Sequence, residues 1–366
     1  MPEWENFIQK DQLPAYRLLI RLSRADLKGD EKGEIISFLK TTPIDWGVVF
    51  NLCGTHRVLP VLYHNIRQLA LQPYLPAFVR EKLSQRYLRV IGNNLRLQKQ
   101  LLSVLALFES RDIPAVPFKG PVLAQILYGD SALRYCQDLD VLVPKVCVAA
   151  ARDALLQSDY APYIKGISDK QFQQIIKYGR EIEFLDPSGK VCLDLHWELS
   201  PAFGRVYDYD FCKDRLRVMR LDGRAVYSLS AEDTLLHLCM NGAYDLWANL
   251  DKILCVADFL VTHPEIDWDL VQTLARALRC RKALLLGLFL ARDVFDAAVP
   301  RELADQIEKN TEIQKLAESI YGQLFKDTRH NSYIEKRMGQ LPFYLKMREN
   351  MFDKSVYLLR RIFVPT

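Results

Sequence analysis

Two acidic residues at the start of an apolar strand constrain this chain more than any other feature. The segment Asp138-Leu139-Asp140-Val141-Leu142-Val143 alternates as a strand does, with apolar side chains at every second position. Because successive side chains of a strand point to opposite faces, Asp138 and Asp140 share the other face, about 7 Å apart. A turn or a solvated strand edge can carry the same pair, but packing against a core does not explain it.

The acidic pair has the chemistry of a metal site. Mg²⁺ and Mn²⁺ take oxygen ligands, and Mg²⁺ commonly bridges protein carboxylates to substrate phosphates. A third carboxylate, Asp194, lies in a second apolar alternation that follows the turn at 186–189. This arrangement predicts a hairpin strand beside the first one. We therefore expect Asp138, Asp140 and Asp194 to be catalytic residues that hold a divalent ion.

His196 shares the predicted strand face of Asp194. On that face it is a candidate for contact with an acceptor substrate. The alternative is a histidine that is simply hydrogen-bonded within the fold, which is the commoner situation on a strand.

The residues before the acidic pair have the pattern of a phosphate-binding corner. A short strand at 115–118 leads into Lys119-Gly120, and a helix with Pro121 in its first turn follows. Free backbone N–H groups at a helix start suit a phosphate, and Lys119 adds a positive charge. We expect Lys119, Gly120 and Arg134 to bind nucleotide, with Arg134 clamping a phosphate or bracing the carboxylates.

These motifs together resemble the polymerase-β-like nucleotidyltransferase superfamily, and more closely its uncharacterised bacterial nucleotidyltransferase branch. The matching residues are Lys119-Gly120, Tyr128, Arg134, Asp138 to Val143 and Asp194 to Trp197. The resemblance extends upstream into 45–60 and downstream into 230–239, so it covers most of the chain. Better-known superfamily members carry Gly-Ser or Gly-Gly where Lys119-Gly120 stands, which implies a different phosphate grip here.

The resemblance implies a reaction. A Mg²⁺- or Mn²⁺-dependent enzyme would move a nucleoside monophosphate from an NTP to an acceptor and release pyrophosphate. The acceptor stays open, with a small molecule or a protein favoured over nucleic acid. Two other classes remain: a catalytically weak nucleotide-binding or scaffold protein that keeps the fold, and an RNA-modifying transferase.

The predicted fold class is α+β. We expect a small mixed-sheet nucleotidyltransferase core at 111–229, flanked by an N-terminal helical region at 1–110 and a C-terminal helical domain at 230–366. Within the core, the order is strand, helix, strand, helix, a strand near 160 and the hairpin at 180–197.

Charge and composition bear on which partners and which compartment we expect. The net charge of +4 is too small to imply nucleic acid, although residues 326–366 carry nine Lys/Arg against four Asp/Glu. This basic tail is the feature that keeps the RNA-modifying class open. The start of the chain is acidic and polar rather than a secretory leader, and no apolar run is long enough for a transmembrane segment. We expect a cytoplasmic protein, and the oligomeric state stays open.

Overall fold

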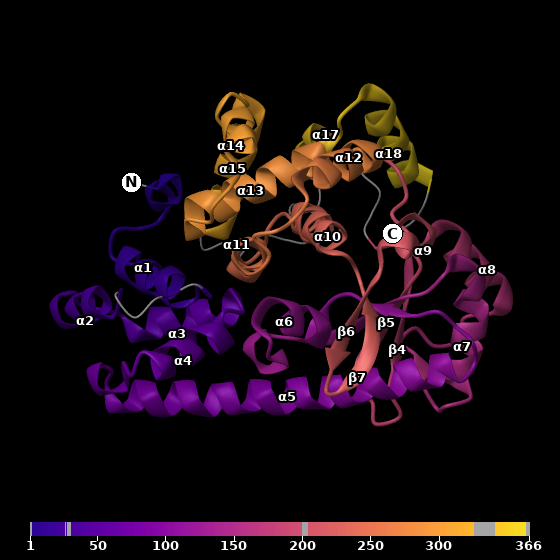
Figure 1. The fold of residues 1–366 in the computed structure, drawn as a ribbon, viewed down its shortest axis with the longest axis horizontal. Helices are drawn as coiled ribbons and strands as arrows, with labels where there is room; N and C mark the ends of the chain where they lie inside the picture. Colours follow the sequence, from indigo (N-terminus) through magenta and orange to yellow (C-terminus); the bar gives the residue numbers. More distant parts are fainter. Residues whose placement is uncertain (1, 26, 28–30, 200–203, 326–340, 364–366) are drawn as a thin grey trace.

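The fold is a small sheet between two sets of helices, which confirms the predicted α+β class (Figure 1). The structure is a computed structural model that describes residues 2–25, 27, 31–199, 204–325 and 341–363. Residues 326–340 and 364–366 of the basic tail lie outside this description. The division into three domains stays a prediction. Along the chain, an N-terminal set of helices is followed by the sheet and then by a C-terminal set of helices.

The N-terminal region is helical, as expected from its apolar spacing. Its longest helix, α5, has 33 residues and runs along the lower edge of the molecule in Figure 1. One half of α5 packs on the N-terminal helices, and the other half packs under the sheet through Leu97, Leu101 and Val104. The elements of this region are η1 (Glu3–Phe7), α1 (Leu13–Leu22), α2 (Lys32–Thr41), α3 (Trp46–Thr55), α4 (Leu59–Gln68), η3 (Gln72–Tyr74) and α5 (Ala77–Glu109).

The central sheet has five strands in the order β1-β2-β5-β4-β3. The strands β2 and β5 are parallel, and β4 with β5 forms the predicted antiparallel hairpin. The elements of this region are β1 (Val116–Pro117), α6 (Gly120–Tyr128), η4 (Ser131–Leu133), β2 (Asp138–Leu142), η5 (Lys145–Cys147), α7 (Val148–Leu156), β3 (Ala161–Pro162), α8 (Asp169–Tyr178), β4 (Glu181–Leu185), β5 (Cys192–His196), α9 (Tyr209–Cys212), η6 (Lys213–Arg215), β6 (Arg217–Leu221) and β7 (Arg224–Ser228).

The two faces of the sheet differ in chemistry. Leu139, Val141 and Leu193 are almost fully buried against α5, α7 and α8, so the alternation of the strands is explained by one shared core. The carboxylates of β2 and β5 lie on the opposite face. The register places Asp140 of β2 directly beside Asp194 of β5.

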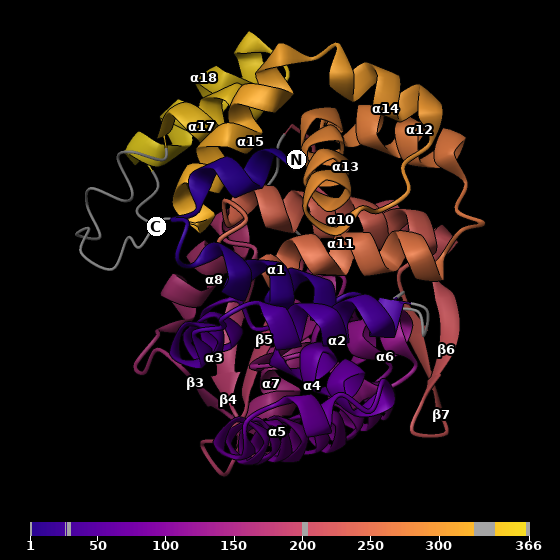
Figure 2. The same ribbon diagram turned by 90° about the vertical axis from the view of Figure 1, so that its left-hand side faces the viewer.

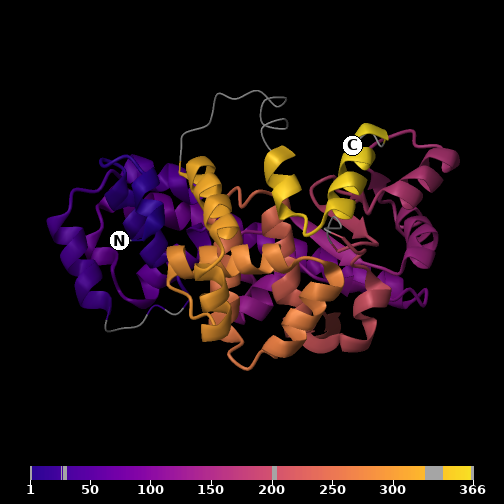
Figure 3. The same ribbon diagram turned by 90° about the horizontal axis from the view of Figure 1, so that it is seen from above.

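The C-terminal helices lie above the sheet, on the side opposite α5 (Figures 1 and 2). Viewed from above, they run across the middle of the molecule, between the N-terminal helices and α8 (Figure 3). The first helix begins after a capping residue, Ser230, whose side chain accepts a hydrogen bond from the Asp233 N–H. The elements are α10 (Ala231–Tyr244), α11 (Leu250–Thr262), α12 (Trp268–Leu278), α13 (Arg281–Phe295), α14 (Arg301–Glu308), α15 (Thr311–Leu324), α17 (Leu341–Met347) and α18 (Met351–Phe363).

Helix α8 was not expected from the sequence. It begins with a capping box in which Ser168 and Gln171 satisfy each other's backbone N–H groups, and one of its residues, Phe172, is buried on the core. Across the described ranges, none of the helices combines the length and apolar character that a membrane span requires.

Candidate active site

The loop from β1 to α6 needs a glycine at position 120. Gly120 has a φ of +55°, in the left-handed region that favours glycine. A Cβ built there would lie 3.1 Å from the carbonyl oxygen of Asp138. The backbone thus passes so close to the start of β2 that Lys119 and the first turn of α6 are held beside the carboxylates.

Asp140 lies at the centre of the site. Lys119 Nζ donates to its Oδ1 over 2.9 Å, and His196 Nε2 lies 3.1 Å from the same oxygen. The side chain is only 4% exposed, and its second oxygen, Oδ2, is buried without a hydrogen-bond partner. A buried carboxylate oxygen without a partner is unfavourable unless a ligand satisfies it.

Glu181 on β4 is a residue that the sequence reading missed. Its Oε2 lies 3.0 Å from His196 Nδ1, at an angle away from a linear hydrogen bond. Arg180 Nη2 donates to the other oxygen, Oε1, over 3.0 Å. The signal was present in the strand pattern, because Glu181 and Glu183 alternate with buried Ile182 and Phe184.

Burial and neighbouring charges shift the pKa values of the three aspartates in different directions. Burial, and then the negative charges of Asp140 and Asp138, raise the pKa of Asp194 to about 7. Burial and the charge of Asp140 also raise the pKa of Asp138. Burial opposes ionisation of Asp140 as well, but Lys119 and His196 hold its pKa far below the ordinary range. Asp140 is therefore the permanent anion of the group.

His196 is buried, with 3% of its surface exposed. Burial alone would lower the pKa of the ring, but its contacts with Asp140 and Glu181 raise it. His196 and further charges lower the pKa of Glu181 to about 2, against the effect of burial. The ring is thus enclosed between two carboxylates rather than open to an acceptor.

Three of these residues can share one metal ion. Ligand atoms of Asp140, Asp194 and His196 lie within 4.8 Å of one another, among the described residues. Asp138, the third residue of the predicted metal site, is not part of this group. The unpartnered Oδ2 of Asp140 and the mixed oxygen and nitrogen donors fit a divalent cation.

Arg134 points away from this group. Its Nη2 donates to Asp251 Oδ2 over 3.0 Å, and its Nε donates to Cys255 Sγ over 3.3 Å, both on α11. Its charge still reaches Asp138, whose pKa it lowers. The geometry gives no support to the prediction that Arg134 binds nucleotide.

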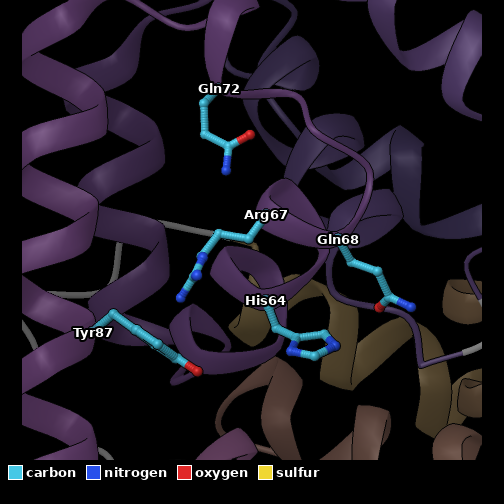
Figure 4. A pocket seen from close by; sticks show the side chains of 5 residues that line it. All are labelled: His64, Arg67, Gln68, Gln72 and Tyr87. Atoms are coloured by element: carbon cyan, nitrogen blue, oxygen red, sulfur yellow. The ribbon is translucent and has the colours of Figure 1, made fainter.

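A separate hollow lies far from the strands in the sequence, at the N-terminal helices (Figure 4). The side chains that line it are all polar, and none is a carboxylate. This hollow therefore lacks the ligands that a Mg²⁺ site needs. The lining residues are His64, Arg67, Gln68, Gln72 and Tyr87.

Comparison with known proteins identifies the family of the chain. A family model described as uncharacterised nucleotidyltransferase matches residues 42–296, more than half of the chain. The chain belongs to this nucleotidyltransferase family. The match includes both flanks at 45–60 and 230–239, where the sequence resemblance extended. No curated protein matches the chain significantly.

Solved structures of distant nucleotidyltransferases show limited likeness. The crystal structure of ANT(2")-Ia in complex with adenylyl-2"-tobramycin is 14% identical, with a TM-score of 0.36, and covers 50% of this chain and 97% of its own. An antigenic nucleotidyltransferase-like protein from Paracoccidioides brasiliensis is 19% identical, with a TM-score of 0.31, and covers 55% of this chain and 97% of its own.

Proposed function

We propose that this nucleotidyltransferase transfers a nucleoside monophosphate from an NTP to an acceptor, in a reaction that depends on Mg²⁺ or Mn²⁺ and releases pyrophosphate. The observation that carries the proposal is the buried, unpartnered Oδ2 of Asp140 beside Asp194. A divalent cation would give this oxygen a ligand. A triphosphate bound to the cation would supply the nucleotide that a nucleotidyltransferase needs.

Asp140 and Asp194 hold the ion in this proposal, and Asp138 contributes from the same face of β2. The ion supplies charge stabilisation for the phosphate oxygens and aligns the attacking and leaving groups. Glycine at position 120 lets the backbone approach Asp138 closely, so that the triphosphate reaches the ion from the first turn of α6.

Lys119 changes partner when nucleotide binds. Its ammonium group neutralises Asp140 in the structure described here. With a divalent ion beside Asp140, Lys119 would be free to pair with a phosphate at the helix start. Lys119-Gly120 would thus serve where better-known superfamily members carry Gly-Ser or Gly-Gly.

Asp194 serves as ligand of the ion or as the base that accepts the acceptor's proton. A pKa of about 7 suits a general base at neutral pH. The acceptor is proposed to be a small molecule or a protein, and the compartment is proposed to be the cytoplasm.

One observation favours a second candidate function. Lys119 and His196 already compensate the negative charge of Asp140. A protein that binds no metal would need this compensation to be stable. A catalytically weak nucleotide-binding or scaffold protein would retain this arrangement.

Release of pyrophosphate separates the two candidates. We would incubate the protein with each NTP, Mg²⁺ or Mn²⁺ and a panel of small-molecule and protein acceptors, and measure pyrophosphate with a coupled assay. Metal-dependent release that Asp140→Asn abolishes and Glu265→Gln, a change of an exposed glutamate on the loop between α11 and α12, retains supports the enzyme. NTP binding without release in any combination supports the second candidate.

A further inference from the structure

Glu181, His196 and Asp140 form a continuous line across three neighbouring strands. The register pairs Glu181 of β4 with His196 of β5, so the two side chains stand on the same face of the sheet. The imidazole lies between the two carboxylates, with Glu181 at 3.0 Å from Nδ1 and Asp140 at 3.1 Å from Nε2.

The ring of His196 is fixed in place by its surroundings. The Phe118 ring meets it edge-on, with centroids 5.0 Å apart and an interplanar angle of 76°. Only 3% of the residue is exposed, so the ring has little room to turn. Nε2 is therefore held toward Oδ1 of Asp140, the carboxylate whose other oxygen, Oδ2, has no partner.

This arrangement resembles a metal-binding histidine beside its supporting carboxylate: Glu181 Oε2 lies 3.0 Å from Nδ1, although the contact lacks the geometry of a hydrogen bond. A histidine that binds a metal through one ring nitrogen usually gives the other N–H to a carboxylate, carbonyl or water, which sets the tautomer and the ring orientation. Two neighbouring ligand atoms of one six-coordinate ion lie about 3 Å apart. The separation between Nε2 and Asp140 Oδ1 matches that spacing.

We propose that His196 supplies a nitrogen ligand to the divalent ion, and that Glu181 is the positioning residue that orients the ring for this role. The inference rests on the proposed function, because it specifies the ligands of the same ion. It assigns His196 to the metal rather than to the acceptor. It also makes the site more favourable for a first-row transition ion such as Mn²⁺ than an all-oxygen site would be.

A metal binds only a ring nitrogen that carries no proton. Nε2 would therefore face the ion without a proton, and the proton of the neutral ring would lie on Nδ1, 3.0 Å from Glu181.

Electron spin echo spectroscopy of bound Mn²⁺ tests the nitrogen ligand directly. The full-length protein would be loaded with one equivalent of Mn²⁺, and the ¹⁴N modulation of a coordinated imidazole would be recorded. We expect this modulation in the unchanged protein and its loss in His196→Gln, whose amide N–H can still donate to Asp140. Bound Mn²⁺ without ¹⁴N modulation in the unchanged protein overturns the inference.

Calorimetric titration with Mn²⁺ and Mg²⁺ tests the role of Glu181. Loss of a carboxylate that orients a metal-binding histidine weakens metal affinity by roughly 10- to 100-fold. We expect Glu181→Met to weaken Mn²⁺ binding by about this factor and Glu181→Gln, which keeps an acceptor oxygen, to weaken it less. The matched control is Glu265→Met, a change of an exposed glutamate on the loop between α11 and α12, which should bind Mn²⁺ normally.

The outcomes separate this inference from the proposed function. Equal Mn²⁺ affinity in Glu181→Met and Glu265→Met overturns the role of Glu181. Metal-dependent pyrophosphate release without ¹⁴N modulation overturns the nitrogen ligand but retains the proposed function. Absence of any Mn²⁺ or Mg²⁺ binding, with and without NTP, overturns both.

Discussion

Two partly buried polar clusters flank α6, and they differ in one respect. The first contains Lys119, Asp140 and His196 and ends in a carboxylate oxygen that has no partner. The second joins α6 and its following turn to α11. It pairs Arg134 with Asp251, and the Tyr128 hydroxyl donates to Asp258 over 2.6 Å.

Every carboxylate oxygen of the second cluster has a donor. Asp258 Oδ1 accepts from the Ala25 N–H over 3.0 Å, and Asp251 Oδ1 accepts from Cys255 Sγ at 3.8 Å. Satisfied buried polar groups hold elements together, whereas an unsatisfied one indicates a site for a ligand. The second cluster therefore has a structural role, because it joins α6 to α11 and the N-terminal region. The first cluster has the unsatisfied oxygen of a ligand-binding site.

The largest expected effect is on turnover, from Asp194→Asn in the first cluster. Removal of a general base or a metal ligand should lower the rate of pyrophosphate release by roughly 10²- to 10⁴-fold. The free energy of unfolding should stay equal or rise, because Asn removes a buried charge that Asp140 and Asp138 repel. Activity assays and urea unfolding measure the two effects. A variant that loses activity only because it is unfolded would contradict the comparison.

The opposite result is expected for Asp251→Ala in the second cluster. This change leaves the buried guanidinium of Arg134 without its carboxylate, which should lower the free energy of unfolding by about 3–5 kcal/mol. The double variant Arg134→Met/Asp251→Leu should recover much of that stability, since it removes both charges. Urea unfolding measures both variants. A loss of Mn²⁺ affinity at unchanged stability would place this pair in the metal site instead.

Low pH should destabilise the contact between His56 and the start of α11. The Leu250 N–H points to His56 Nδ1 at 3.4 Å, and the Asp251 N–H donates to the His56 carbonyl at 3.1 Å. Burial lowers the pKa of His56 to about 4, from an ordinary value of 6.5. The unfolded chain therefore binds the proton first as pH falls, so stability is full above pH 6.5 and is lost down to about pH 4. The expected loss is about 3 kcal/mol.

Urea unfolding between pH 7.5 and pH 4.5 checks this loss. We expect His56→Gln to have a shallower pH dependence than the unchanged protein. His64→Gln, a histidine on the neighbouring helix α4, serves as the control and should leave the slope unchanged. Equal slopes in all three proteins would show that His56 does not contribute to it.

A smaller effect on stability is expected from Gly120→Ala, with Gly129→Ala as its matched control. Both glycines have positive φ, so each alanine should cost about 1–2 kcal/mol of backbone strain. A Cβ at position 129 meets nothing within 4 Å, whereas at position 120 it meets the Asp138 carbonyl at 3.1 Å. NTP titrations should therefore show weakened binding in Gly120→Ala only. Equal NTP affinity in the two variants would remove the β1–α6 corner from the site.

The local parts of the fold were predictable from the sequence, because periodicity and turn residues are local signals. The β2 alternation and the β4–β5 hairpin are both confirmed. Helix α8 was missed although the capping box of Ser168 and Gln171 was available.

Contacts between distant segments were not predictable in the same way. The partner of Arg134 is Asp251, which is 117 residues further along the chain and on a helix whose packing depends on the whole core. The pairing of Glu181 with His196 depends on the strand register, and a shift of one residue would place Glu181 on the other face. The residue types were therefore enough to identify the carboxylate face of the sheet. Which side chains on that face contact each other depends on the strand register.

The central claim is that the carboxylate face of β2 and β5 holds a divalent ion with a nucleotide. Calorimetric titration of each NTP, with and without Mg²⁺, into the unchanged protein and an Asp138→Asn/Asp140→Asn variant tests this most directly. We predict Mg²⁺-dependent NTP binding that the folded variant has lost. Equal binding in both proteins, or binding that is independent of the metal, would contradict the account.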